Sequence, residues 1–229
     1  MGWRALRALA YLVCAGDGMA TAQTRPVVIA ILPFEDRGSY GQDKEVFRAL
    51  ALGIPATLAS DLSGHSGLRL ADRDRVARAL QAQGLGPNAR LDAATAAKTG
   101  KEVGARYAVT GSFADFYGKF RMDARIVDAE NGQILKVVSN NDPGLQDRAD
   151  LSRIIQMVAH RILAESIPSA RGGADATVVP TEAITQYSLG LLYESEGDKA
   201  KAVDYYQRAL TAFPGYSAAK EGLQRARAP

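Results

Sequence analysis

The feature that most constrains the fold is an uninterrupted apolar run at residues 27–32, which ends at Pro33. A run of this length, rich in β-branched residues, is typical of a strand that is buried on both faces, as in the centre of an α/β sheet. Helices are then expected on both sides of that sheet. An apolar fraction of 47% over 229 residues is enough for such a core, and it excludes disorder of the whole chain.

Helical periodicity follows this strand. Apolar residues recur every four positions over 46–62, which predicts a helix, and Pro55 within it predicts a kink or a restart. A short second strand is expected at 68–70. Two more helices are expected after it, one capped by Asp72 or Asp74 and one in the alanine-rich stretch that follows.

Further along the chain the apolar period changes to two. Strand-like segments at 107–113, 119–127 and 134–138 are separated by turn signals, and Asn131-Gly132 between the last two is a strong hairpin signal. An antiparallel meander is therefore expected, with a helix at 147–167 behind it. The predicted fold class is α/β, a mixed sheet with flanking helices, followed by a small all-α helical hairpin.

The amino terminus has the pattern of a signal peptide at residues 1–22. Arg4 and Arg7 give a basic start, residues 8–15 are apolar, and Ala20-Thr21-Ala22 offers the small residues that a signal peptidase accepts. This apolar stretch is too short to span a membrane, because a helix needs about 20 residues to do so. We therefore expect export, with the mature protein in the periplasm.

Lipidation of Cys14 is the alternative to cleavage after Ala22. Lipoprotein signals place a small residue directly before the cysteine, whereas Val13 precedes Cys14. An outer-membrane lipoprotein is therefore the less favoured localisation, while outer-membrane association stays possible.

The C-terminal part has a pattern of its own. Residues 168–181 show no apolar periodicity and are expected to link an α/β domain at 23–167 to a unit at 182–229. In that unit, small and aromatic residues stand at fixed spacings: Leu189, Gly190, Tyr193, Gly197, Ala202, Tyr206, Ala209 and Pro214. With them the unit resembles a single tetratricopeptide (TPR) repeat, followed by a capping helix.

The TPR resemblance implies two antiparallel helices, the first of which lines a protein-binding concave face. On that face we expect Ile184, Tyr187, Leu191 and Glu194 to contact a partner. Tyr187 would be the anchor, because aromatic side chains bury much area at little entropic cost. A single repeat cannot bury its own faces, so the unit is expected to dock on the α/β domain, on another copy or on a partner.

The α/β domain carries a second set of motifs: Pro33-Phe34-Glu35-Asp36, Leu70-Ala71-Asp72-Arg73, Gln83-Gly84-Leu85 and the stretches 104–112 and 126–134. With these motifs it resembles the periplasmic domain of the curli-secretion lipoprotein CsgG, and more broadly the amino-terminal domain of TolB and the flagellar protein FlgO. The resemblance supplies no catalytic residue. It does not extend to the membrane-inserted hairpins of the secretion channels, because the loop at 115–119 is far too short for strands of about 9–11 residues.

Composition excludes several classes of site. With 28 Lys and Arg against 25 Asp and Glu, the formal charge of +3 is too small for a nucleic-acid binder. One cysteine and two histidines exclude a disulfide scaffold and a Cys/His zinc cluster, and we expect no metal or cofactor. His65 is interpreted as a helix-end residue, His160 as a surface residue, and the arginines around residues 69–78 as a solvated face.

Short signatures of penicillin-recognising serine enzymes also occur, at Ser217–Lys220, Ser139–Asn141 and Lys98–Gly100. Their order along the chain is reversed and they fall on separate predicted elements, so no catalytic residue is assigned. Asp72 and Asp74 are interpreted as helix caps and not as a catalytic carboxylate pair.

The sequence therefore predicts an exported, non-enzymatic protein of the bacterial cell envelope that acts as a protein-interaction or assembly module. Envelope proteins would bind through the TPR unit, and the α/β domain could form a homo-oligomer. The alternative is an oligomeric component of a curli-type outer-membrane secretion apparatus, and a hydrolase is the third and least favoured function.

Overall fold

The computed structural model describes residues 25–41, 43–86, 89–140, 146–167 and 178–228. The predicted signal peptide and most of the predicted linker lie outside these residues. The elements up to residue 166 are β1 (Val27–Asp36), α1 (Lys44–Leu62), β2 (Leu68–Leu70), α2 (Arg73–Ala82), α3 (Ala93–Glu102), β3 (Tyr107–Phe116), β4 (Lys119–Asp128), β5 (Ile134–Ser139), β6 (Gln146–Asp147), the 3-10 turn η1 (Arg148–Asp150) and α4 (Leu151–Ser166). Three more helices follow: α5 (Thr181–Ser195), α6 (Lys199–Ala212) and α7 (Ser217–Arg227).

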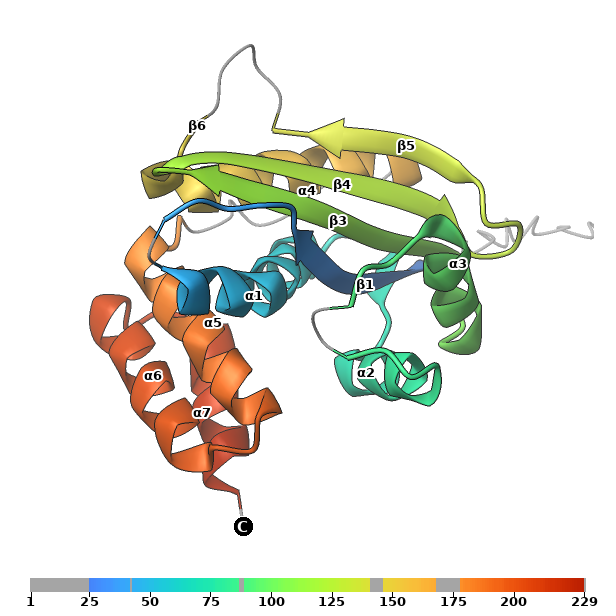
Figure 1. The fold of residues 1–229 in the computed structure, drawn as a ribbon. Coiled ribbons are helices and arrows are strands. Elements are labelled where there is room, and N and C mark those ends of the chain that lie inside the picture. Colours follow the sequence, from blue (N-terminus) through green and yellow to red (C-terminus); the bar gives the residue numbers. More distant parts are fainter. Residues whose placement is uncertain (1–24, 42, 87–88, 141–145, 168–177, 229) are drawn as a thin grey trace, which may run out of the picture.

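The sheet is mixed, as predicted. Its strand order is β2-β1-β3-β4-β5, and β6 pairs with β4 beside β5. Strand β1 is parallel to both β2 and β3, whereas β3, β4 and β5 form the expected antiparallel meander. The α/β class and the mixed sheet are therefore confirmed (Figure 1).

Strand β1 continues past the point at which the sequence predicted its end. The register with β3 shifts between Ile31 and Phe34, which accommodates Pro33 because proline has no N–H to give to a neighbouring strand. The hydroxyl of Thr110 donates to the Pro33 carbonyl at 3.1 Å, and pairing resumes as far as Asp36.

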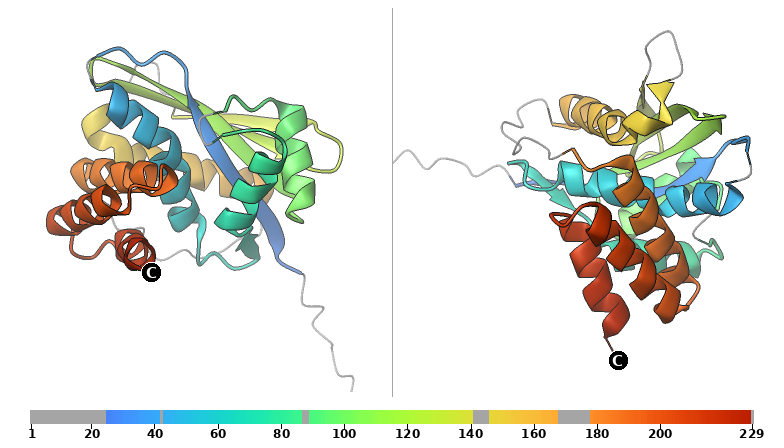
Figure 2. Two further views of the ribbon diagram at one scale, coloured as in Figure 1. Left: turned by 60° about the horizontal axis from the view of Figure 1, so that its bottom comes forward. Right: turned by 90° about the vertical axis from the view of Figure 1, so that its left-hand side faces the viewer.

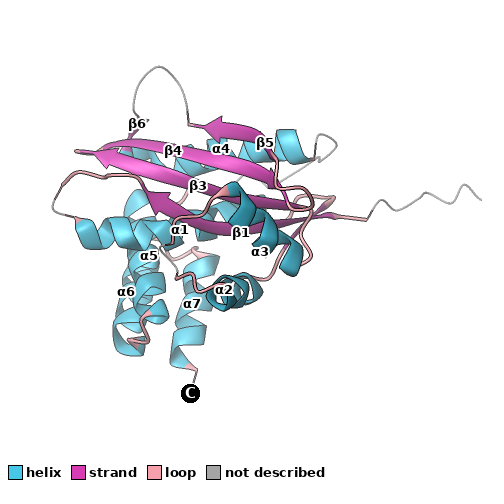
Figure 3. Cartoon of the chain, turned by 45° about the vertical axis from the view of Figure 1, so that its right-hand side comes forward, coloured by secondary structure: helices cyan, strands magenta, loops and turns pink. Residues whose placement is uncertain are grey.

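Both faces of the central strands are covered, as the apolar run predicted. Helices α1 and α4 pack on one face, where Ile29, Val109 and Ile126 are buried. Helices α2 and α3 cover part of the other face over Ala30 and Ala108. Figure 3 shows α3 in front of the sheet and α4 behind it.

Helix α1 runs without interruption from Lys44 to Leu62, so Pro55 does not start a second helix. The turns on both sides of Pro55 are held by packing, because Leu50, Ile54 and Leu58 are all fully buried in the core. Tertiary burial here outweighs the local cost of proline in a helix.

Helices α5 to α7, which we call the C-terminal helical unit, pack on the side of α1 that faces away from the sheet (Figure 2). The hydroxyls of Thr57 and Tyr216 are 3.2 Å apart and hydrogen bonded across this contact. At the other end of α1, Arg48 forms an ion pair with Glu196. Among the described residues, none of the helices combines the length and apolarity that a membrane-spanning segment needs.

The carboxyl group of Asp61, near the end of α1, gives this region a pH-dependent stability. One of its oxygens is buried without a hydrogen-bond partner among the described residues, and burial raises the pKa of Asp61 from 3.8 to about 6. Between these two pH values the folded chain keeps a proton that the unfolded chain has lost. Stability therefore falls as the pH rises from about 4 to about 6, and the cost of the buried charge is complete above pH 6.

We therefore expect Asp61→Asn to raise the free energy of unfolding by about 1–2 kcal/mol at pH 7.5, because the amide carries no charge to desolvate. The gain should shrink towards zero near pH 4, where the folded wild type is neutral at this position. Urea unfolding of both proteins at pH 4.5, 6 and 7.5 measures this. A gain that does not depend on pH would contradict the assignment.

Candidate functional site

Three of the four predicted contact residues are covered by the chain itself. Ile184 lies in the core beneath the sheet, and Leu191 lies in the core of the C-terminal helical unit. Tyr187 is only 4% exposed and packs between Tyr206 and Tyr216, with ring centroids 5.8 and 5.0 Å away. A partner could reach these side chains only if α1 or α7 moved, so their role in binding stays a prediction.

Glu194, the fourth predicted contact, joins α5 to α7. Its carboxylate accepts from the Arg225 guanidinium at 3.1 and 3.2 Å and from the hydroxyl of Tyr206. Burial, followed by this hydrogen bond to Glu194, raises the pKa of Tyr206. The face that the sequence assigned to a partner is thus occupied by α7 on one side and by α1 on the other.

The possible catalytic residues lie on separate elements. Lys98 is on α3, Ser139 ends β5 and Ser217 begins α7. Helix α7 packs against α5 and α6, whereas α3 packs against α2, β1, β3 and β4, so the structure does not bring these side chains into one site.

The remaining polar candidates cap a helix, lie at a helix end or lie on the surface. Asp72 caps α2 by accepting from the Arg75 backbone N–H at 2.9 Å, as predicted. The Nδ1 atom of His65 lies 3.2 Å from the Leu62 carbonyl at the end of α1, and His160 is exposed on α4. Within the described ranges, no three His, Cys, Asp or Glu side chains come together as metal ligands could.

Exposed large apolar side chains point to a different part of the molecule. One group lies where the C-terminal ends of β1 and β3 meet, and a second lies on the edge strand β5. The first group is Tyr40 at 57%, Phe116 at 38% and Tyr117 at 85% exposure, and the second is Ile134, Leu135 and Val137. We call Tyr40, Phe116 and Tyr117 the aromatic tip.

The rings of the aromatic tip stack on one another. The Tyr40 ring lies 5.8 Å from Phe116 and 6.5 Å from Tyr117, centroid to centroid, with interplanar angles of 27° and 25°. Tyr117 has a φ of 54°, the left-handed region that costs a non-glycine residue about 1 kcal/mol. An apolar ring held in solvent by a strained backbone does not serve folding, so it marks a candidate for function.

Backbone hydrogen bonds hold the aromatic tip in place. The Tyr40 N–H donates to the Asp115 carbonyl at 2.7 Å, which ties the loop after β1 to the β3–β4 turn. The Asp115 N–H donates to the Ser39 hydroxyl at 2.9 Å, and the Gly118 N–H donates to the Asp115 carboxylate at 2.7 Å. The rings thus project from a rigid turn.

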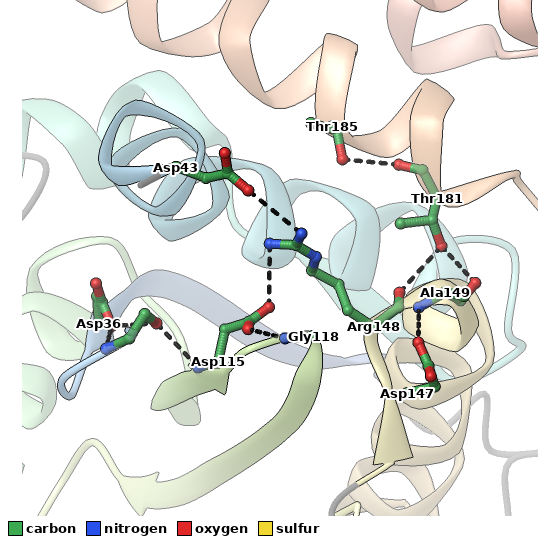
Figure 4. A network of polar contacts seen from close by, with 10 residues as sticks. Asp36, Asp43, Asp115, Gly118, Asp147, Arg148, Ala149, Thr181 and Thr185 are labelled. Carbon is green, nitrogen blue, oxygen red and sulfur yellow. Dashed lines mark hydrogen bonds and ion pairs between the residues drawn. The ribbon is translucent and has the colours of Figure 1, made fainter. Parts of the chain in front are cut away.

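An ion pair lies directly beneath this turn (Figure 4). The Asp115 carboxylate is only 1% exposed and lies 3.1 Å from the Arg148 guanidinium, which also reaches Asp43 at 3.4 Å. A buried carboxylate needs such a partner, because an unpaired charge in the interior is strongly destabilising. Arg148 therefore holds the β3–β4 turn, the start of α1 and the η1 turn together.

The sequence predicted the turn at Gly118 but not the aromatic tip. The Phe116-Tyr117 pair could have been noticed as two aromatic residues at a turn. Tyr40 could not, because it comes from a loop without periodicity that reaches Phe116 only through the parallel alignment of β1 with β3.

Comparison with known proteins gives partial likenesses of fold. No protein-family model and no curated protein matches the chain. The LpoB C-terminal domain from Escherichia coli is 20% identical, with a TM-score of 0.38 over 52% of this chain and 84% of that domain. The corresponding domain from Salmonella enterica gives a TM-score of 0.37, again at 20% identity over 52% of this chain and 84% of that one. A hypothetical protein from Chlamydia trachomatis is 11% identical, with a TM-score of 0.37 over 63% of this chain and 99% of its own. Likeness of this degree identifies neither a family nor a function.

Proposed function

We propose that this chain is an exported, non-enzymatic protein of the bacterial cell envelope that binds a protein partner through the aromatic tip. The observation that carries the proposal is the tip itself, three stacked and exposed aromatic side chains on a turn fixed by hydrogen bonds and by the Asp115–Arg148 ion pair. Export rests on the signal-peptide pattern at residues 1–22.

A protein partner fits the chemistry of the tip. Aromatic side chains dominate the energetically important centres of protein interfaces, because they bury a large area and have few rotatable bonds. A preformed turn lowers the ordering cost of binding further. The acidic side chains near the tip form ion pairs within the chain: Asp43 and Asp115 pair with Arg148, and Asp147 pairs with Lys119 at 3.4 Å. The surface therefore offers apolar contact more than net charge.

The proposal keeps the predicted domain organisation. The α/β domain at 23–167 would be of the CsgG/TolB type, joined by the linker at 168–181 to a single TPR-type repeat and cap at 182–229. Support for the repeat comes from Gly190, where an added Cβ would lie 2.5 Å from the ring of Tyr206, and Gly222 of the capping helix leaves room for the same ring, with an added Cβ 2.7 Å from it. The TPR pattern places small residues where two helices touch, so that an aromatic ring can lie between them.

Replacing Tyr117 by asparagine tests the role of the tip. Asparagine tolerates a positive φ, so Tyr117→Asn should leave the free energy of unfolding unchanged or raise it by up to about 1 kcal/mol. Binding of the partner should weaken at least about tenfold, because the most exposed ring is lost. The partner is sought by pull-down from the native envelope fraction, and its affinity is then measured with both purified proteins.

Val178→Asn is the matched control, because Val178 is 53% exposed and lies outside the tip. The proposal predicts that at least one envelope protein is pulled down by the wild type and by Val178→Asn, but not by Tyr117→Asn. If every retained protein binds Tyr117→Asn with wild-type affinity, the tip is not the binding surface.

The edge of β5 favours a second candidate function, an oligomeric component of an outer-membrane secretion apparatus. Ile134, Leu135 and Val137 expose apolar surface on an edge strand, which natural proteins usually protect. Multi-angle light scattering on the purified chain distinguishes the two candidates, because a ring component should form a defined higher oligomer and a monomer would count against it.

A further inference from the structure

Arg148 lies where the aromatic tip meets the C-terminal helical unit. Its side chain pairs with Asp115 beneath the tip, and its backbone N–H donates to the Gly118 carbonyl in the same turn at 2.7 Å. Its own carbonyl accepts from the Thr181 hydroxyl at 3.3 Å, and the next carbonyl, that of Ala149, accepts from the same hydroxyl at 2.7 Å. Figure 4 shows that these contacts form one continuous network from α5 to the β3–β4 turn.

We propose that Arg148 is a positioning residue through which docking of the C-terminal helical unit sets the conformation of the aromatic tip. The inference deepens the proposed function, because it assigns a means of regulating the same surface. The C-terminal helical unit then acts on binding without touching the partner.

The Asp115 carboxylate links the β3–β4 turn to Arg148. One of its carboxylate oxygens accepts from the Gly118 N–H, which shapes the turn that carries Tyr117, and the other faces the Arg148 guanidinium. Because this carboxylate is buried, the turn keeps its geometry only while the guanidinium stays in place.

The position of the Arg148 guanidinium depends on the η1 turn. That turn is short, and at its start Asp147 accepts from the Ala149 N–H at 2.9 Å. Thr181, the first residue of α5, holds the two carbonyls of the turn with its hydroxyl. Docking of α5 thereby fixes the η1 turn, which fixes the guanidinium.

A contact of Arg148 with α1 completes the arrangement. Its guanidinium lies over the Phe47 ring, 5.9 Å from the ring centroid, and reaches Asp43 at the start of α1. The C-terminal helical unit packs on this same helix, so displacement of the unit would disturb the guanidinium both through α1 and through the η1 turn.

Hydrogen exchange in the full-length protein tests the coupling with a matched pair of substitutions. Thr181→Val removes the hydroxyl that holds the η1 turn. Thr185→Val makes the same chemical change one helical turn later, where the hydroxyl donates to the Thr181 carbonyl within α5, at 2.9 Å, and not to the η1 turn. We expect Thr181→Val to speed exchange of the Tyr40 and Gly118 amides about three- to fivefold, whereas Thr185→Val should leave them unchanged.

A second pair tests Arg148 directly. Arg148→Gln should speed exchange of the same two amides by at least about tenfold, since Asp115 loses its charge partner. Arg153→Gln is the control, because Arg153 is an exposed arginine nearby on α4 whose ion-pair partner among the described residues is Asp150, at 3.7 Å. If Arg148→Gln acts but Thr181→Val does not, Arg148 stabilises the turn locally and the proposed coupling is overturned. Equal effects of Thr181→Val and Thr185→Val would overturn it as well.

This readout does not need a partner. Suppose that Thr181→Val speeds exchange at the tip, but that no protein is found whose binding is lost in Tyr117→Asn. The coupling would then stand, and the proposed function would be refuted. Unchanged exchange in Thr181→Val, together with a partner lost by Tyr117→Asn, would refute the coupling alone.

Discussion

Replacing Gly53 by alanine is expected to detach the C-terminal helical unit from α1 and to lower the free energy of unfolding by about 3 kcal/mol. Gly53 lies in the middle of α1, where alanine ordinarily stabilises a helix by about 1 kcal/mol. Here an added Cβ would lie 1.7 Å from the Ser188 hydroxyl oxygen and 3.1 Å from the Ser188 Cα on α5. Neither helix can accept that overlap, so the substitution should reverse the usual sign.

The loss should appear in two measurements. Denaturant unfolding gives the change in stability, and hydrogen exchange across α5 shows whether the contact with α1 has opened. The Ser188 side chain cannot turn away into solvent, because it is fully buried and its hydroxyl donates to the Ile184 carbonyl at 2.6 Å. Adding Ser188→Gly to Gly53→Ala removes the closest atoms and should restore part of the stability.

Gly86→Ala serves as the control for the glycine-to-alanine change itself, because in the part of the chain that the structure describes no atom lies within 4 Å of a Cβ at that position. A Gly53→Ala protein as stable as the wild type, with α5 still protected from exchange, would show that α5 does not pack on α1 as described.

Replacing Tyr206 by alanine is expected to cost about 3–5 kcal/mol and to unfold the C-terminal helical unit. Tyr206 is fully buried at the centre of that unit, between the glycines of α5 and α7 that lie against its ring. Because Gly190 and Gly222 have no side chains to close the gap, the cavity cannot collapse. Calorimetry and far-UV circular dichroism would record the loss of helix.

Tyr206→Phe separates the packing of the ring from its hydroxyl. It keeps the ring and removes only the hydrogen bond to Glu194, so it should cost about 1 kcal/mol. If alanine and phenylalanine gave equal losses, the stability would come from the Tyr206–Glu194–Arg225 contacts and not from packing around the ring.

Agreement between sequence and structure is best where the signal is local. The apolar run at 27–32 identified the central strand because burial on both faces removes the need for polar residues. The Asn131-Gly132 signal correctly placed the β4–β5 hairpin, although only Gly132 has a positive φ, of 76°. The connection is longer than a two-residue turn, because the Asp128 side chain accepts from the Glu130 N–H at 2.8 Å and organises the loop.

Differences arise where two distant segments meet. The periodicity of α5 showed which of its faces are apolar, but it did not show that α1 and α7 would cover them. Tyr187 was therefore predicted on a binding face, whereas in the structure it lies in the core of the C-terminal helical unit. No sequence pattern indicated that Arg148 and Asp115 would form an ion pair. They are 33 residues apart in the chain and come together only when β6 joins the sheet beside β4.

By itself, the sequence determined the kinds and order of the main elements, though not β6 or the η1 turn, together with the mixed sheet and the small residues that let the C-terminal helices approach one another, because period, capping and glycine spacing act over a few residues. Only the tertiary structure decided which apolar surfaces stay open. An apolar face is buried or exposed according to what packs against it, and that depends on contacts between segments far apart in the chain. The aromatic tip therefore became visible only once Tyr40 lay beside Phe116.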